Sequence, residues 1–166
     1  MYNSGVVFKH LGSLILATAA AFCQDTAPTI RIDGDIARPW TVGSADLAKM
    51  TRTTVRTSND GVEVVYDGVW LHDLLVRAGV PAGAELRGKA LTTYVLVEAS
   101  DGYQVLFSPA ELDPVFGGHE VLLADRADGK ALFGMQGSFR LVAPGEKRGA
   151  RSIRMVSRIS VVQVRK

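Results

Sequence analysis

The chain of 166 residues contains one cysteine, Cys23, and three histidines. A lone cysteine excludes an internal disulfide, and Cys23 lies at the end of an apolar N-terminal segment. From Gln24 onward the sequence therefore offers no thiolate nucleophile and no thiolate metal ligand. Catalytic classes that depend on a cysteine are excluded for this part of the chain.

Other catalytic signatures are missing as well. The sequence has no phosphate-binding Walker motif, no dinucleotide fingerprint after a first strand and no nucleophile elbow. His72 and His119 have no partner at metal-ligand spacing, so we expect surface or core histidines and no metal site. Glu111 and Asp113 are expected on a solvated turn. No established catalytic motif identifies a reaction.

The N-terminal segment has the layout of a secretory signal peptide. One early charge, Lys9, precedes an uncharged run from Leu11 to Phe22, and polar residues follow Cys23. The run is shorter than the ~20 residues that span a bilayer, so no membrane span is expected. Phe22 is bulkier than the residue that lipoprotein signals place before their cysteine, which argues against a lipid anchor. The pattern predicts a signal peptide over residues 1–23 and a periplasmic or secreted protein.

The rest of the chain, residues 30–166, has the size and composition of one domain: 47% of the whole sequence is hydrophobic and 22% charged. Alternation around Ile30 and Ile32 predicts an edge strand, and Asp60-Gly61 predicts a hairpin turn. Helices are expected to end at Gly79 and to begin at Ser108, whose sequence Ser-Pro-Ala-Glu combines a cap, a proline and an acid. Several strands without regular strand-helix alternation predict an α+β domain with a mixed β-sheet.

The apolar positions of these elements define the expected core, with Trp70 packing at the start of its helix. The side chains predicted to be buried are Val55, Val65, Leu71, Leu74, Leu75, Val95, Val97, Leu106, Leu122, Leu141, Ile153 and Val156.

Positive charge is concentrated near the C-terminus. Residues 146–166 carry seven basic residues and one acidic residue, whereas residues 24–145 carry eleven basic and sixteen acidic residues. No aromatic residue for base stacking occurs between Gly145 and Lys166, and export would remove the usual targets, so nucleic-acid binding is set aside. The segment "GEKRGARS", residues 145–152, indicates either a compact site for a small anion such as phosphate or a solvated basic loop.

The anion-site interpretation rests on the chemistry of this segment. Glycines allow the backbone to turn its N–H groups inward, basic side chains donate charge-assisted hydrogen bonds, and a serine adds a hydroxyl donor. The candidate residues are Lys147, Arg148, Gly149, Arg151 and Ser152.

Four stretches in this order resemble the oxidoreductase molybdopterin-binding domain of the sulfite oxidase family: "YDGVWLHDLLVRAG", "SDGYQVLFSPAEL", "DGKAL" and "GSFRLVAPGEKRGARSIRMVSRISV". The resemblance extends from about Ile30 to Val164 and implies a short, single-domain form of a mixed α+β fold. It further implies a molybdopterin cofactor, held in part by the basic segment, and a small oxyanion or sulfoxide as substrate.

The family's molybdenum-ligating cysteine is expected before "YDGV", where this chain has Arg56, Thr57 and Ser58 instead. A hydroxyl group is a poor substitute for a thiolate because its pKa is high. Thr57 and Ser58 are retained as candidate cofactor contacts. Two alternatives follow: a molybdopterin-dependent oxidoreductase with an altered metal ligand, or a cofactor-free module that binds a small anion or an exported partner protein.

Overall fold

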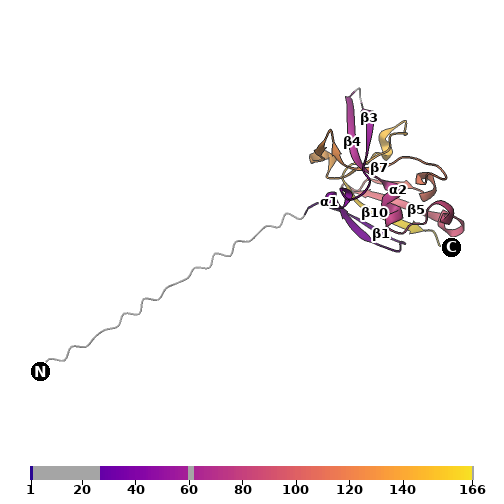
Figure 1. Cartoon of the computed structure of the whole chain (residues 1–166), viewed down its shortest axis with the longest axis horizontal. Coiled ribbons are helices and arrows are strands. Elements are labelled where there is room, and N and C mark those ends of the chain that lie inside the picture. Colours follow the sequence, from indigo (N-terminus) through magenta and orange to yellow (C-terminus); the bar gives the residue numbers. More distant parts are fainter. Residues whose placement is uncertain (2–26, 60–61, 166) are drawn as a thin grey trace.

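The computed structural model describes Met1, residues 27–59 and residues 62–165. Most of the predicted signal peptide, with Cys23, lies outside the described residues. Two β-sheets form most of the domain, and the α-helices are short (Figure 1). No α-helix in the described part of the chain is long and apolar enough to cross a bilayer. The predicted α+β class with a mixed sheet is confirmed.

The first sheet has five strands and carries most of the core on one side. In sheet order they are β2 (Trp40–Gly43), β1 (Thr29–Gly34), β10 (Val156–Gln163), β5 (Thr93–Ala99) and β6 (Gln104–Phe107). β1 and β10 run parallel, and the other neighbours run antiparallel.

The strand β1 is not the edge strand that the sequence predicted. It lies between β2 and β10, and its inward residues Ile30 and Ile32 are fully buried. Asp33 is also buried, and it accepts hydrogen bonds from the Arg158 and Ser160 side chains of β10. Asp33 also pairs with Arg31 of its own strand at 2.6 Å. Its partners in β10 lie about 125 residues away in sequence, so local pattern alone did not reveal the placement.

The second sheet carries a projecting hairpin at one end of the molecule (Figure 1). Its strands are β3 (Thr53–Asn59), β4 (Val62–Trp70), β7 (Leu122–Ala127), β8 (Lys130–Ala131) and β9 (Arg140–Val142), the last pairing with β7. β3 and β4 pair antiparallel from Thr53 opposite Gly68 to Asn59 opposite Val62. This register confirms the predicted hairpin, whose turn residues 60–61 lie outside the described part.

Three short α-helices connect the strands: α1 (Ser44–Leu47), α2 (Leu71–Arg77) and α3 (Pro109–Leu112). Gly79 follows α2 with a φ of 89°, a left-handed conformation that glycine adopts without strain. Ser108 caps α3 as predicted: its hydroxyl accepts the Glu111 N–H at 3.1 Å, and the Glu111 carboxylate accepts the Ser108 N–H at 2.9 Å.

Most of the predicted core is buried, with two exceptions. Leu106 is 54% exposed because Val105 and Phe107 are the inward residues of the edge strand β6. Val65 is half-buried because it pairs with Arg56 on the outer face of the hairpin, while Tyr66 points inward. Trp70 is half-buried at the N-cap of α2 and packs against the smaller core cluster of the second sheet.

The expectation of a solvated turn at Asp113 is wrong. Its side chain is buried and accepts the backbone N–H groups of Gly83 at 2.6 Å and Val115 at 2.8 Å. The carboxylate thus ties the turn after α2 to the loop after α3, a long-range role that the sequence pattern did not indicate.

We expect Asp113→Asn to destabilise the fold by about 2 kcal/mol at pH 7, because an amide satisfies two N–H donors less well than a carboxylate. The Gly83 N–H, with smaller contributions from Val115 and His72, holds the pKa of Asp113 below its usual value against the opposing effect of burial. Because the pKa of Asp113 is lower in the folded protein than in the unfolded protein, where it is about 4, the ionised carboxylate stabilises the folded state above about pH 4. This stabilisation is lost as the pH falls through the folded-state pKa.

The difference in unfolding free energy between the two proteins should therefore shrink from pH 7 to about pH 3 in urea titrations. Asp101→Asn, at an exposed turn, is the control. A difference that stays constant over this range would contradict the assignment.

Candidate anion site

A cavity of about 410 Å³ lies between the β3–β4 hairpin, β9 and the segment that follows β9. This volume is within the range of small-molecule sites, about 300–1,000 Å³. The lining residues are Arg56, Thr57, Ser58, Tyr66, Arg140, Val142, Ala143, Pro144, Glu146, Lys147, Gly149 and Ser152. We call this cavity the anion cavity, because three of its side chains are cationic and one is anionic.

The structure brings together most of the residues that the sequence predicted. Lys147, Gly149 and Ser152 line the anion cavity from one side, and Thr57 and Ser58 line it from the hairpin. Ser152 accepts the Ala143 N–H at 3.1 Å through its hydroxyl oxygen, so its own O–H stays available to donate. Thr57 shares its face of the hairpin with Tyr66, because it pairs with Val64, two residues before Tyr66 in β4.

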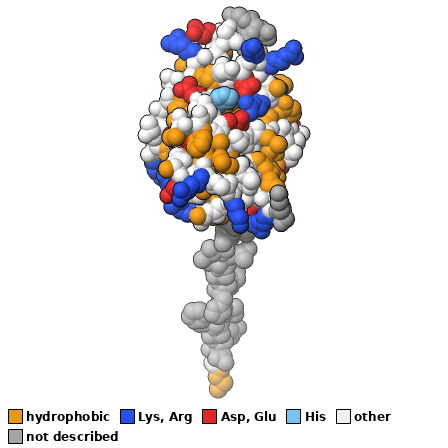
Figure 2. All heavy atoms as spheres, turned by 90° about the vertical axis from the view of Figure 1, so that its right-hand side faces the viewer, with side chains coloured by type: hydrophobic (Ala, Val, Ile, Leu, Met, Phe, Trp, Pro, Cys, Tyr) orange, Lys and Arg blue, Asp and Glu red, His pale blue; other side chains and the backbone are white. Residues whose placement is uncertain are grey.

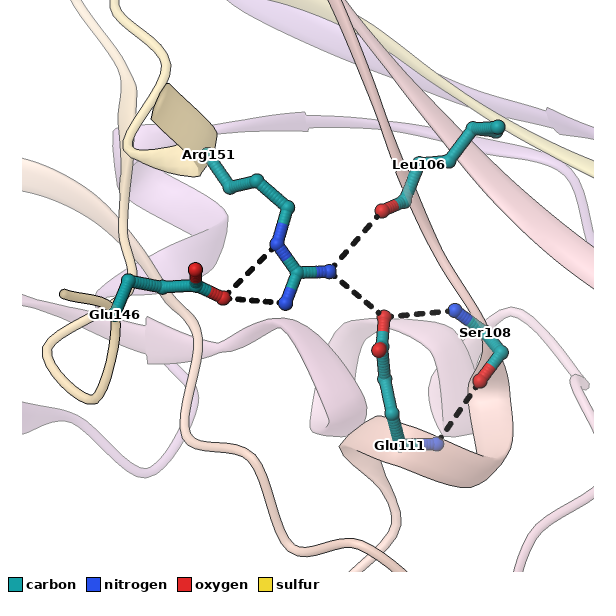
Figure 3. A network of polar contacts seen from close by, with 5 residues as sticks. All are labelled: Leu106, Ser108, Glu111, Glu146 and Arg151. Carbon is teal, nitrogen blue, oxygen red and sulfur yellow. Dashed lines mark hydrogen bonds and ion pairs between the residues drawn. The ribbon is translucent and has the colours of Figure 1, made fainter. Parts of the chain in front are cut away.

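Two predicted residues, Arg148 and Arg151, do not line the anion cavity. Arg148 is exposed. Arg151 lies in the 3₁₀ turn η4 (Gly149–Arg151) and extends toward α3 instead (Figure 3). Charge density in the sequence identified the segment but not the direction of each side chain.

Arg151 forms a network with two carboxylates (Figure 3). Its Nε donates to Glu146 Oε1 at 2.9 Å, and its Nη2 pairs with the same oxygen. Its Nη1 donates to Glu111 Oε1 at 3.2 Å and to the Leu106 carbonyl at 3.3 Å, and the guanidinium lies 4.7 Å from the centre of the Phe107 ring. Burial lowers the pKa of Arg151, but Glu146 and Glu111 outweigh it and raise the pKa.

Arg140, at the start of β9, is a cationic cavity residue that the sequence did not identify. Its Nη1 donates to Tyr66 Oη at 2.8 Å and to Gln136 Oε1 at 2.5 Å, and its guanidinium lies 4.8 Å from the centre of the Tyr66 ring. Its Nε is buried and has no hydrogen-bond partner among the described residues, and no described carboxylate pairs with it.

The surroundings of Arg140 are electrically unfavourable for a cation. Burial has the largest effect and lowers the pKa of its guanidinium, Tyr66 opposes burial, and the positive charge of Arg154 lowers the pKa by a smaller amount. A buried guanidinium next to another cation, with an unpaired N–H, is strongly stabilised by an anion. The sequence did contain one signal: Arg140 interrupts the apolar run from Phe139 to Ala143. The other residues of this run are buried in the structure.

His72 and His119 are the histidines of the described residues. Within residues 27–59 and 62–165, no group of three His, Cys, Asp or Glu side chains is arranged to hold a metal ion. His72 and His119 line a smaller cavity of about 160 Å³ together with Trp70. On the face shown in Figure 2, basic side chains lie near the upper and lower ends and do not form one continuous patch.

A family model described as "Oxidoreductase molybdopterin binding domain" matches residues 22–166. The chain belongs to this family. Among solved structures, the sulfane dehydrogenase SoxCD from Paracoccus pantotrophus is similar, with a TM-score of 0.63 and 22% sequence identity. The match covers 81% of this chain and 38% of the SoxCD chain, so this protein corresponds to a minor part of that structure. No curated protein sequence matches.

The described residues fit one half of a molybdenum-bearing pterin cofactor. The unpaired Arg140 Nε, the Lys147 ammonium and the hydroxyls of Ser152 and Thr57 suit the phosphate and the polar pterin edge. The metal half finds no thiolate in the described ranges, and Thr57 and Ser58 line the cavity from the hairpin. The described residues of the cavity therefore offer donors for an anion but no cysteine for ligation of molybdenum.

Proposed function

We propose that the anion cavity binds the phosphate-bearing pterin of the molybdenum cofactor, and that the domain acts in an exported, molybdopterin-dependent oxidoreductase. The observation that carries this proposal is the half-buried Arg140, whose buried Nε is unpaired and which has no carboxylate partner in the described part of the chain. Family membership supports a molybdopterin phosphate as the anion. When bound, the cofactor supplies the redox chemistry, while the protein supplies binding and orientation.

The cavity residues have distinct roles in this proposal. Arg140 presents its guanidinium to a phosphate oxygen, and its Nη1 is held in place by Tyr66 and Gln136. Lys147 is exposed and adds a mobile positive charge at the cavity edge. Ser152 donates its hydroxyl hydrogen from a position fixed by the Ala143 N–H.

The substrate class follows from the same charges. Arg56 and Lys147 are exposed at the cavity and favour approach of a small anion over a cation. A small oxyanion, or a sulfoxide with its polar S–O bond, suits these donors.

Export of the protein rests on the predicted signal peptide over residues 1–23. Recovery from the periplasmic fraction, with an N-terminus beginning after residue 23, would test it.

A second candidate function is a cofactor-free module that binds a small anion or an exported partner protein. The observation that favours it is the donor set of the hairpin: Thr57 and Ser58 present hydroxyls, which are weak ligands for molybdenum unless the metal removes their protons. This candidate retains the Arg140 anion site and dispenses with the redox centre.

Cofactor loading separates the two candidates. The full chain is purified from a host that makes molybdenum cofactor, and pterin and molybdenum are measured per protein molecule. Near-stoichiometric pterin with metal is the expected result. Absence of both, under conditions that load another family member, would contradict the first proposal, and binding of inorganic pyrophosphate by that same preparation would support the second.

A further inference from the structure

A glutamate occupies an unexpected position in the wall of the anion cavity. Glu146 lines both the anion cavity and an adjacent cavity of about 240 Å³, and it is half-buried. A free carboxylate at such a position repels a bound phosphate, because like charges close together in a partly desolvated site are unfavourable. The charge of Glu146 therefore needs compensation if the cavity is to hold an anion.

Arg151 provides that compensation from outside the cavity. Two of its nitrogens, Nε and Nη2, donate to the same oxygen of Glu146, although Arg151 is not a lining residue. Its remaining contacts fix the guanidinium from the opposite side: Nη1 bonds to Glu111 and Leu106, and the Phe107 ring lies 4.7 Å from the guanidinium carbon. Glu111 is itself fixed by the N-cap of α3 (Figure 3).

The other cavity cations do not take this role in the structure. Arg56 pairs with Glu63 at 3.6 Å, and Arg140 bonds to Tyr66 and Gln136. Lys147 is next to Glu146 in sequence but forms no ion pair with a described carboxylate. Arg140 and Lys147 thus have no ion pair with a described carboxylate, while Arg151 neutralises Glu146.

We propose that Arg151 is a positioning residue that makes the cavity selective for anions by holding and neutralising Glu146, and that it does not itself contact the ligand. This inference rests on the proposed anion-binding function. A positioning role and a purely structural role of Arg151 predict different results. In a positioning role, the charge of Glu146 weakens anion binding when Arg151 is absent, and removal of that charge restores binding.

The test compares four forms of the full chain: wild type, Arg151→Met, Glu146→Gln and the double variant. Inorganic pyrophosphate is titrated at low ionic strength. Arg151→Met is expected to bind about tenfold more weakly, because an uncompensated carboxylate then faces the ligand. The double variant should return to within about threefold of wild type. Glu146→Gln alone should bind as tightly as wild type or up to about threefold more tightly, because the cavity wall then loses its negative charge.

A structural role predicts the opposite for two of these proteins. If Arg151 only anchors the segment, Glu146→Gln should weaken binding, and the double variant should bind no better than Arg151→Met. Either result would overturn the inference.

Arg87→Met removes an exposed positive charge elsewhere and controls for net charge. An equal loss of pyrophosphate binding in Arg87→Met would also overturn the inference. If Arg151→Met does not fold, Glu146→Gln still decides by the sign of its effect. Failure of the wild type to bind pyrophosphate or pterin would instead contradict the proposed function.

Discussion

Replacement of Arg140 by methionine is expected to weaken pyrophosphate binding about a hundredfold. The guanidinium is half-buried in the anion cavity, and its buried Nε is free to donate. Charge-assisted hydrogen bonds to a buried ligand contribute about 1.5–3 kcal/mol each, and tenfold in affinity corresponds to about 1.4 kcal/mol. Loss of one such bond together with the charge itself gives about 3 kcal/mol. Isothermal titration with pyrophosphate, and pterin retained after purification, measure the effect.

The stability of the ligand-free protein should respond differently. In the wild type, burial and the charge of Arg154 act against Arg140, whereas its bonds to Tyr66 and Gln136 stabilise it. Because these contributions oppose one another, we expect the unfolding midpoint without ligand to change little in Arg140→Met. The increase in midpoint that pyrophosphate produces in the wild type should disappear.

Two further variants serve as controls: a conservative change at Arg140 and a charge removal away from the anion cavity. Arg140→Lys keeps the charge but loses the planar set of donors, so an intermediate loss of about tenfold is expected. Arg87→Met should bind like the wild type. Equal, small losses in Arg140→Met and Arg87→Met would contradict the assignment of Arg140 as the principal anion contact.

The elements that the sequence predicted correctly are those determined by neighbouring residues. The β3–β4 hairpin follows from two β-rich runs around one turn, and α3 follows from the reciprocal bonds between Ser108 and Glu111. The central position of β1 depends on pairing with β10, at the far end of the chain. Such pairing leaves no local pattern, which is why β1 was predicted at the edge.

In the candidate site, too, the sequence predicted what depends on neighbouring residues and not what depends on distant ones. Local charge and glycine content were sufficient to select residues 145–152, and the structure places Lys147, Gly149 and Ser152 of this segment around the cavity. The direction of Arg151 depends on Glu111, 40 residues away, and Arg140 reaches Tyr66, 74 residues away. Partners at such separations are determined by the fold, so a single sequence could not assign these two arginines to their roles.

Gly137→Ala is expected to lower the stability of the fold by about 3 kcal/mol. Gly137 has a φ of 71°, and a Cβ atom there would lie 2.5 Å from the Met155 Cα and 3.0 Å from the Met155 backbone nitrogen. Neither backbone atom can move without breaking the bond at 3.0 Å between the Met155 N–H and the Gln136 carbonyl. Urea unfolding measures the loss.

The matched control is Gly129→Ala in the turn between β7 and β8. Gly129 has a similar φ of 75°, but no atom lies within 4 Å of the position that its Cβ would take. This variant therefore measures the cost of the left-handed backbone alone, about 1 kcal/mol. Equal losses in the two variants would contradict the close approach at Met155.

Gly137→Ala should also weaken pyrophosphate binding, whereas Gly129→Ala should leave it unchanged. Gln136, the residue before Gly137, accepts the Arg140 Nη1 hydrogen bond, so a displaced backbone at 137 moves the partner that orients the guanidinium. The backbone bond between Val156 and Phe139 at 2.9 Å ties β10 to the residue that precedes Arg140. The close crossing of residues 137 and 155 therefore positions the anion contact, and its tight packing explains why glycine is required at this point.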